Sequence, residues 1–283
     1  MNTIIIATDF SETAENATRY GVALTQQIGG SVVLFHLYRP SIHVANARLS
    51  PSALDESAAQ ARDRLNERAA QLAEAYGVSV IPHMSVFGTF EEKVEQLFTE
   101  HHARLLVMGM APKSLEQDLL GNTTTAIIHQ YRFPVLAVPL AAEFKGISRM
   151  LFACDKLLGV SRRILDEIRV LAKSSGATVE IFHVNDRITA IRNTGDADRV
   201  IQRFGEGLEG ITYYYRDVDS NSVIKAIADE LERSNADLLI MLPNRYGFWS
   251  SLIHRSKTRI MAAGLKVPLL SIPLAAARNG SSA

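Results

Sequence analysis

The sequence has one cysteine and one tryptophan among 283 residues, and its charges cancel. The lone thiol, Cys154, excludes an internal disulfide framework, which is typical of a protein from a reducing compartment. Thirty basic and thirty acidic residues leave a formal net charge of +0. Without a basic field, neither nucleic acid nor an anionic membrane surface is an expected partner.

Long hydrophobic runs are absent as well. No stretch reaches the roughly 18 consecutive apolar residues of a membrane-spanning helix. The N-terminus carries neither the basic region nor the cleavage site of a secretory signal. We therefore expect a cytoplasmic protein with no membrane partner. Its 47% apolar and 21% charged residues are those of an ordinary globular protein.

What the sequence does contain is a repeat of a whole domain. Apolar runs of the first half recur in the same order in the second half. The matched segments are 4–9 with 150–155, 31–36 with 178–183, 103–108 with 236–241, and 134–139 with 268–273. We expect two domains, at 1–142 and 148–274, with a linker around 141–148 and a flexible tail at 275–283.

Each half alternates short apolar runs with amphipathic stretches, which predicts parallel strands covered by helices on both faces. In the first half we expect strands at 4–7, 32–37, 78–84, 105–108 and 135–138. We expect helices from Ser11 to Gly29 and at 53–76, 90–100 and 123–131. The predicted fold class is therefore α/β, with two tandem five-stranded parallel sheets.

The second half departs from the first between its second and third strands. Polar, glycine-rich residues 187–210 replace the long second helix there, and we expect a short helix or an irregular loop. Gly205, Gly207 and Gly210 have the spacing Gly-x-Gly-x-x-Gly, but they precede a strand predicted at 211–215. A dinucleotide-binding loop follows a strand and opens a helix, so this motif does not predict one.

Open α/β sheets bind ligands beyond the carboxyl ends of their strands. Asp9 follows the first strand, where a carboxylate can accept hydrogen bonds from a ribose hydroxyl or a base amino group, or can cap the next helix instead. After the fourth strand, Gly109 begins a loop that ends at Gly121, and residues 122–125 open a helix. Such a helix start can bind an anion, or it can be an ordinary capped loop.

These features resemble the universal stress protein family over essentially the whole chain. The resemblance rests on segments 7–12, 107–109, 121–124 and 134–138 and on His36. It implies a tandem member of the family, with a stress-linked regulatory role through ligand binding. Some members bind ATP and others do not. The binders carry a loop with Gly, two residues, Gly, nine residues, Gly, and then Ser or Thr.

Carried over by position, the resemblance implies an adenine nucleotide such as ATP in the first half. The residues that it implies are Ala7, Asp9, Leu37, Met108, Gly109, Gly121, Asn122 and Thr123. The loop departs from the pattern of the binders, because it is one residue shorter and has Pro112 at the middle glycine and Asn122 at the Ser/Thr position. Proline removes an amide donor and fixes φ, so we expect weak binding.

The second half departs further from that pattern. Leu242 stands at the position of Gly109, and Arg255 at the position of Gly121. We therefore expect no nucleotide there. The aromatic residues within 246–249 either plug the pocket, form an interface or make an ordinary packing cluster.

No catalytic or metal site is predicted. His101 and His102 are adjacent, whereas a metal pair on a helix needs i, i+4 spacing. Neither a nucleophile elbow nor a P-loop lysine motif occurs. We expect a binding protein rather than an enzyme. A nucleotide-independent protein-interaction module and a slow ATP hydrolase are the alternatives. The apolar segments 135–138 and 269–272 are predicted to pair with each other or across a homodimer.

Overall fold

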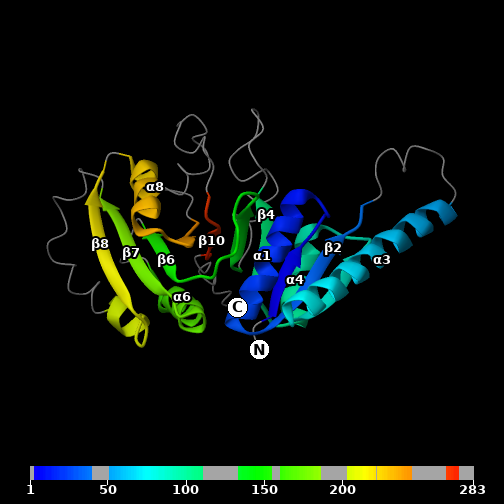
Figure 1. Cartoon of the computed structure of the whole chain (residues 1–283), viewed down its shortest axis with the longest axis horizontal. Helices are drawn as coiled ribbons and strands as arrows, with labels where there is room; N and C mark the ends of the chain where they lie inside the picture. The colour runs from blue at the N-terminus through cyan, green and yellow to red at the C-terminus, as the bar shows by residue number, and fades with distance from the viewer. Residues whose placement is uncertain are drawn as a thin grey trace, which may run out of the picture.

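A single sheet of ten strands runs through the molecule in the order β3-β2-β1-β4-β5-β10-β9-β6-β7-β8 (Figure 1). The computed structural model describes residues 3–39, 51–110, 133–154, 160–185, 203–220, 222–243 and 266–273. Neighbouring strands are parallel except for β5 and β10, which are antiparallel. The predicted α/β class, with five parallel strands in each half, is confirmed.

The elements follow the chain in the alternation that the sequence predicts. The first half contains β1 (Thr3–Ala7), α1 (Glu12–Ile28), β2 (Ser31–Leu37), α3 (Pro51–Tyr76), β3 (Ser79–Ser85), α4 (Phe90–Glu100), β4 (Ala103–Met110) and β5 (Val135–Pro139). The second half contains β6 (Arg149–Cys154), α6 (Arg162–Ser175), β7 (Thr178–Asn185), β8 (Tyr213–Asp219), α8 (Val223–Ser234), β9 (Leu238–Met241) and β10 (Leu269–Ser271).

Two expected elements need comment. The strand predicted at 211–215 begins later and ends later, because Gly210 has a φ of 81° and the turn around it continues to residue 212. Within the segment 187–210, residues 203–207 form a short helix, and its other described residues form a turn. The predicted helix at 123–131 and the predicted tail at 275–283 lie outside the described residues.

Helices cover both faces of the sheet. Residues of α1, α3 and α6 belong to one buried cluster, and residues of α4 and α8 belong to the other. Successive side chains of a strand point to opposite faces, so Ile4 and Ile6 of β1 lie in the first cluster and Ile5 in the second. In Figure 1, α1 lies across the strands of the first half, and α3 extends well beyond the sheet.

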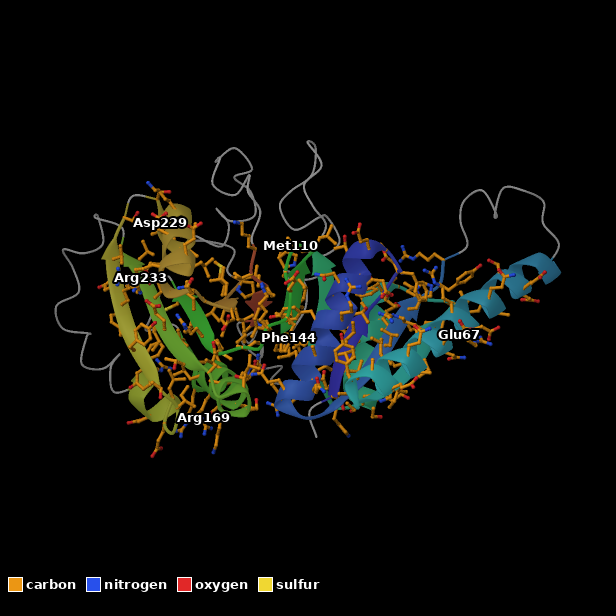
Figure 2. The ribbon with its side chains drawn as sticks, viewed as in Figure 1. Glu67, Met110, Phe144, Arg169, Asp229 and Arg233 are labelled. Atoms are coloured by element: carbon orange, nitrogen blue, oxygen red, sulfur yellow. The ribbon has the colours of Figure 1, made fainter. Side chains whose placement is uncertain are left out.

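The connection between the halves forms neither helix nor strand over residues 141–148. It is nevertheless packed against α1. The side-chain nitrogen of Asn16 donates to the carbonyl of Ala142 at 2.9 Å. The ring of Phe144 meets Tyr20 edge to face, with 5.0 Å between the ring centroids and 89° between the planes. Figure 2 labels Phe144 between the two halves.

The halves meet where β5 and β10 pair, and we call this pairing the seam. Leu136 of β5 lies opposite Leu270 of β10, and both side chains are buried. Beside the seam, the side chain of Gln27 on α1 donates to the carbonyl of Ser175 on α6 at 3.1 Å. In the described sheet, β5 and β10 therefore have a neighbour on each side, and the outer edges are β3 and β8.

Candidate functional site

The strand order of the first half reverses between β1 and β4. From β1 the chain builds β2 and β3 on one side of the sheet, and then β4 and β5 on the other. Open α/β sheets bind ligands outside the carboxyl ends of the strands at such a reversal. Figure 2 labels Met110 at this end of β4. The carboxyl edge of β1, β2 and β4 is therefore the candidate site.

Five of the eight residues predicted for a nucleotide are described, and they meet at this edge. Ala7 ends β1 and Leu37 ends β2. Met108 and Gly109 are the two residues before Met110, which ends β4. Ala7 and Met108 are buried in the cluster on the α4 face, with Leu37 packed against it. Asp9 lies two residues after the end of β1. Gly121, Asn122 and Thr123 lie outside the described residues, as do Pro112, Arg255 and the aromatic residues of 246–249.

Asp9 holds the turn between β1 and α1. Its Oδ1 accepts a hydrogen bond from the backbone N–H of Ser11 at 3.0 Å, and Ser11 in turn caps α1 by accepting from Ala14 N–H at 3.2 Å. Between them, Phe10 has a φ of 62°, in the left-handed region that non-glycine residues seldom adopt. The turn-stabilising role considered for Asp9 is thus present. The bond to Ser11 uses one of two carboxylate oxygens, and the side chain is exposed.

Gly109 has a packing reason to be glycine. A Cβ at this position would come within 2.8 Å of both Cγ2 and the carbonyl oxygen of Thr13 on α1. Real Cβ atoms do not approach backbone so closely, so any larger residue would push α1 away from β4. The glycine is therefore explained without a phosphate, and by itself it is not an argument for one.

The turn is also held from the side of β2 and α3. His36 Nδ1 lies 2.8 Å from the carbonyl oxygen of Thr8. The ring of Phe10 packs against His36, with 4.7 Å between centroids, and the guanidinium carbon of Arg64 lies 4.3 Å from the Phe10 ring centroid. A cation over an aromatic face is attracted by the ring quadrupole. Arg64 thus brings a positive charge from α3 to the turn at the carboxyl edge.

The sequence offered little reason to single out Arg64. It lies on α3 together with Arg62 and Arg68, and nothing in their spacing distinguishes them. The structure does: Arg68 is engaged in an ion pair with Glu15 of α1 at 2.8 Å, whereas Arg64 lies over Phe10. A cation above a turn that carries Asp9 is suited to an anionic ligand.

Comparison with known proteins places these features in a family. The sequence model of the universal stress protein family matches residues 1–139. The first half of the chain belongs to the universal stress protein family. Universal stress protein Slr1230 of Synechocystis sp. is 24% identical, and the match covers 96% of this chain and 99% of that protein. The family resemblance that the sequence indicated is confirmed.

Solved structures of the family share the fold. A universal stress protein from Archaeoglobus fulgidus matches with a TM-score of 0.69 at 22% identity, over 96% of this chain and 98% of its own. A putative universal stress protein from Pseudomonas aeruginosa matches with a TM-score of 0.60 at 14% identity, over 96% and 93%.

The chain also matches part of a larger protein. The Na⁺/H⁺ antiporter NhaS5 of Synechocystis sp. is 20% identical over 204 residues, which are 71% of this chain and only 28% of the antiporter. Among the described residues of this chain, no helix combines the length and the apolar character that a membrane span requires.

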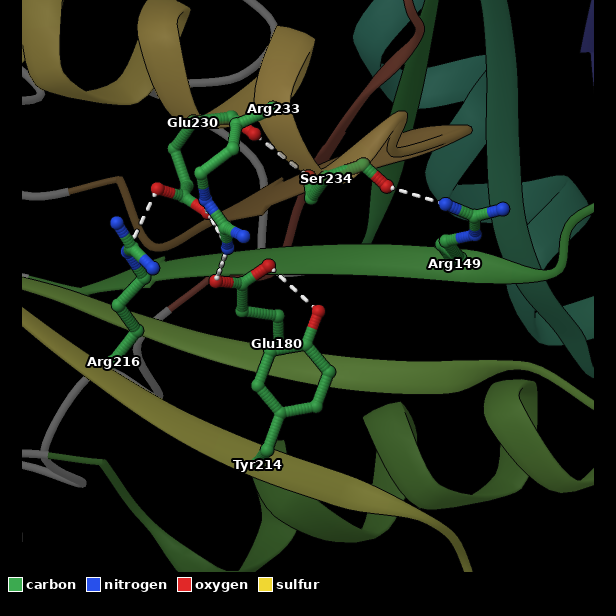
Figure 3. A network of polar contacts seen from close by, with 7 residues as sticks. All are labelled: Arg149, Glu180, Tyr214, Arg216, Glu230, Arg233 and Ser234. Carbon is green, nitrogen blue, oxygen red and sulfur yellow. Dashed lines mark hydrogen bonds and ion pairs between the residues drawn. The ribbon is translucent and has the colours of Figure 1, made fainter.

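The second half carries a polar cluster that the sequence did not single out (Figure 3). Glu180 of β7 and Glu230 of α8 are 2% and 4% exposed. Arg233 donates to both carboxylates, to Glu180 at 2.9 Å. Tyr214 O–H donates to Glu180 at 2.8 Å, and Arg216 lies 2.9 Å from Glu230. Buried carboxylates are tolerated only with such partners.

The first half has apolar residues at the positions equivalent to this cluster. Val33 occupies the place of Glu180, and Ile81, its neighbour on β3, occupies the place of Tyr214. Leu97 lies six residues before β4's Ala103, as Glu230 lies six residues before Ala236. The contact between the sheet and its covering helix is thus apolar in the first half and ionic in the second. A residue-by-residue comparison of the two halves of the sequence could have revealed this polar cluster.

The pKa values of the two buried carboxyl groups are shifted in opposite directions. Burial raises the pKa of Glu180, and the adjacent Glu230 raises it further. Burial also acts to raise the pKa of Glu230, but the hydrogen bond from Arg233 and the charge of Arg216 hold that pKa below its usual value. Of the two carboxyl groups, Glu180 therefore keeps its proton to the higher pH.

We expect Glu180→Gln to change how stability depends on pH. A carboxyl group whose pKa is higher in the folded state than in the unfolded state stabilises the fold while it is protonated. This contribution is complete at pH values below the unfolded-state pKa, and it is lost as pH rises through the folded-state pKa. Glutamine keeps the neutral form at every pH. The free energy of unfolding of the variant should therefore gain on that of the wild type as pH rises above the usual pKa of a glutamate side chain, as measured in urea titrations. Profiles of the variant and the wild type that stay parallel at all pH values would contradict the assignment.

Proposed function

We propose that the first half binds an adenine nucleotide at the carboxyl edge of β1, β2 and β4, and that the chain acts in the stress response by ligand binding rather than by turnover. The proposal rests on one observation. Asp9, Leu37 and the end of β4 meet where the strand order reverses. Family membership supports the proposal, since some members bind ATP.

Each group at the edge has a role in the proposal. The Asp9 carboxylate accepts from the ribose hydroxyls or the base, and the apolar Leu37 and Met108 line the adenosine. Arg64 supplies the positive charge that a triphosphate requires. Gly121, Asn122 and Thr123 form the remaining part of the proposed phosphate site.

Asp9→Asn tests the site without disturbing the turn. Asparagine retains the oxygen that accepts from Ser11 N–H, but its second group is a donor and cannot accept from a ribose hydroxyl. We expect ATP affinity in titration calorimetry to fall about tenfold, which is the usual worth of a hydrogen bond to a charged group. The melting temperature should be unchanged.

Glu12→Gln is the matched control, because it removes an exposed carboxylate three residues away. Equal affinities for the wild type, Asp9→Asn and Glu12→Gln would reject the site. Absence of ATP binding by the wild type would favour the nucleotide-independent interaction module. Magnesium-dependent phosphate release that Asp9→Asn abolishes would instead indicate an enzyme.

We further propose that the two halves, at 1–142 and 148–274, pair within one chain and not across a homodimer. The support is the buried seam, in which Leu136 and Leu270 face each other, and the packing of the linker onto α1. In the proposed arrangement the second half stabilises the first and binds no nucleotide of its own.

A further inference from the structure

A cavity of about 330 Å³ lies between the two halves, away from the candidate nucleotide site. One wall is formed by the amino ends of β1 and β4, with Phe98 and Phe133 beside them. These two rings are stacked, with 3.8 Å between their centroids. The facing wall is α6 of the second half. Cavities of this size are within the range that accommodates small organic ligands.

One face of α6 lines the cavity from end to end. Arg163, Glu167, Val170, Leu171 and Ser174 line it, and their spacing of four, three, one and three residues places them on a single helix face. The fully buried residues of α6 are different ones, although Leu171 also packs against their cluster. Val170 remains 38% exposed, although it is apolar. The helix therefore offers a second stripe, with charged residues at one end and the apolar Val170 and Leu171 further along.

The repeat shows what fills such a groove. Asn16 of α1 donates to the carbonyl of Pro139 at the end of β5, and Arg163 of α6 donates to the carbonyl of Pro273 just after β10. Four residues further along, α1 has Tyr20 where α6 has Glu167. On α1 the linker covers this face and the Phe144 ring packs on Tyr20, which is only 3% exposed. The groove on α1 thus accepts an aromatic ring.

Charge distinguishes the groove on α6. Arg163 pairs loosely with Glu167, at 3.5 Å, and Arg104 of β4 lines the same cavity. Burial raises the pKa of Glu167, and the charges of Arg163 and Arg104 oppose that shift. Two guanidinium groups against one carboxylate leave this end positive. A ligand complementary to this cavity is an apolar molecule that carries one negative charge.

We propose that this cavity binds a small aromatic carboxylic acid, with its ring between α6 and the Phe98–Phe133 pair and its carboxylate at Arg104 and Arg163. The site is independent of the nucleotide site, which lies at the opposite edge of the first half. Because both halves supply the walls, ligand binding here would strengthen their contact.

Titration of the full chain with 2-naphthoate tests the proposal. We expect saturable binding at one site per chain, and at least tenfold weaker binding of the neutral 2-naphthamide. Arg104→Gln, at an exposed position, should weaken naphthoate binding about tenfold. Val170→Trp should abolish binding by filling the groove. Glu167→Gln should tighten it, because a competing carboxylate is removed.

Two substitutions on other faces of α6 serve as matched controls. Arg162→Gln and Lys173→Trp change exposed residues that do not line the cavity, and neither should alter the affinity. The proposal is overturned if naphthoate does not saturate, if naphthamide binds equally well, or if ATP displaces naphthoate. Binding that emerges only after residues 274–283 are deleted would also overturn it, because the tail itself would then be the occupant.

Discussion

Replacing Arg233 with methionine should lower the melting temperature by roughly 10 °C. The guanidinium group contacts both Glu180 and Glu230, which are almost completely buried. Without it, two neighbouring carboxylates remain in an apolar setting with only Tyr214 and Arg216 as partners. Removing one member of a buried ionic group is costly because the remaining charges lose their compensation. Thermal unfolding followed by circular dichroism measures the effect.

The repeat supplies the matching rescue. Combining Arg233→Met with Glu180→Val and Glu230→Leu restores the apolar contact that Val33 and Leu97 make in the first half. We expect the triple variant to melt within a few degrees of the wild type, because apolar replacement of a buried ionic group is often neutral or stabilising. A triple variant as unstable as Arg233→Met alone would show that the cluster does more than join α8 to the sheet.

Leu136→Asp should cost about 4 kcal/mol or more of unfolding free energy. The side chain is 1% exposed and faces Leu270 across the seam, so aspartate would place a carboxylate between two apolar layers. Because the damage is confined to the seam, we expect the single unfolding transition of the wild type to separate into two, one for each half. Differential scanning calorimetry distinguishes one transition from two.

Lys266→Asp is the control for charge near the seam, since Lys266 is exposed and lies just before β10. It should leave the transition unchanged. The wild type should sediment at the mass of one chain, 31.1 kDa, if the halves pair within the chain. A wild-type dimer that Leu136→Asp converts to a monomer, without loss of either half, would place the seam between chains instead.

The sheet was predictable because its strands are continuous apolar runs that occur twice. Ile4 to Ala7 and its counterpart Met150 to Ala153 are buried on both faces, and such runs have few alternatives in a chain of this composition. The ends of strands were less certain. Ile211 has strand-forming character, but Gly210 holds the preceding turn in a left-handed conformation and delays β8.

The contacts around the candidate site could not be read from the sequence in the same way. Asp9 was placed correctly at the end of β1, because that position follows from the strand alone. Arg64 reaches Phe10 across 54 positions of sequence, and Arg233 reaches Glu180 across 53. Such pairs depend on the spatial arrangement of helices and strands. Gly109 was ambiguous for a related reason: only the approach of Thr13 shows what its missing side chain makes room for.

The seam has a consequence for how the two halves can evolve. Two strands joined within one chain are always present together, at an effective concentration set by residues 140–148 and not by the amount of protein. Dilution cannot separate them. In a symmetric dimer every substitution occurs in both subunits. In this chain the two halves differ, because the first has Val33 where the second has Glu180 paired with Arg233. Covalent pairing thus frees each half to acquire a different ligand or contact.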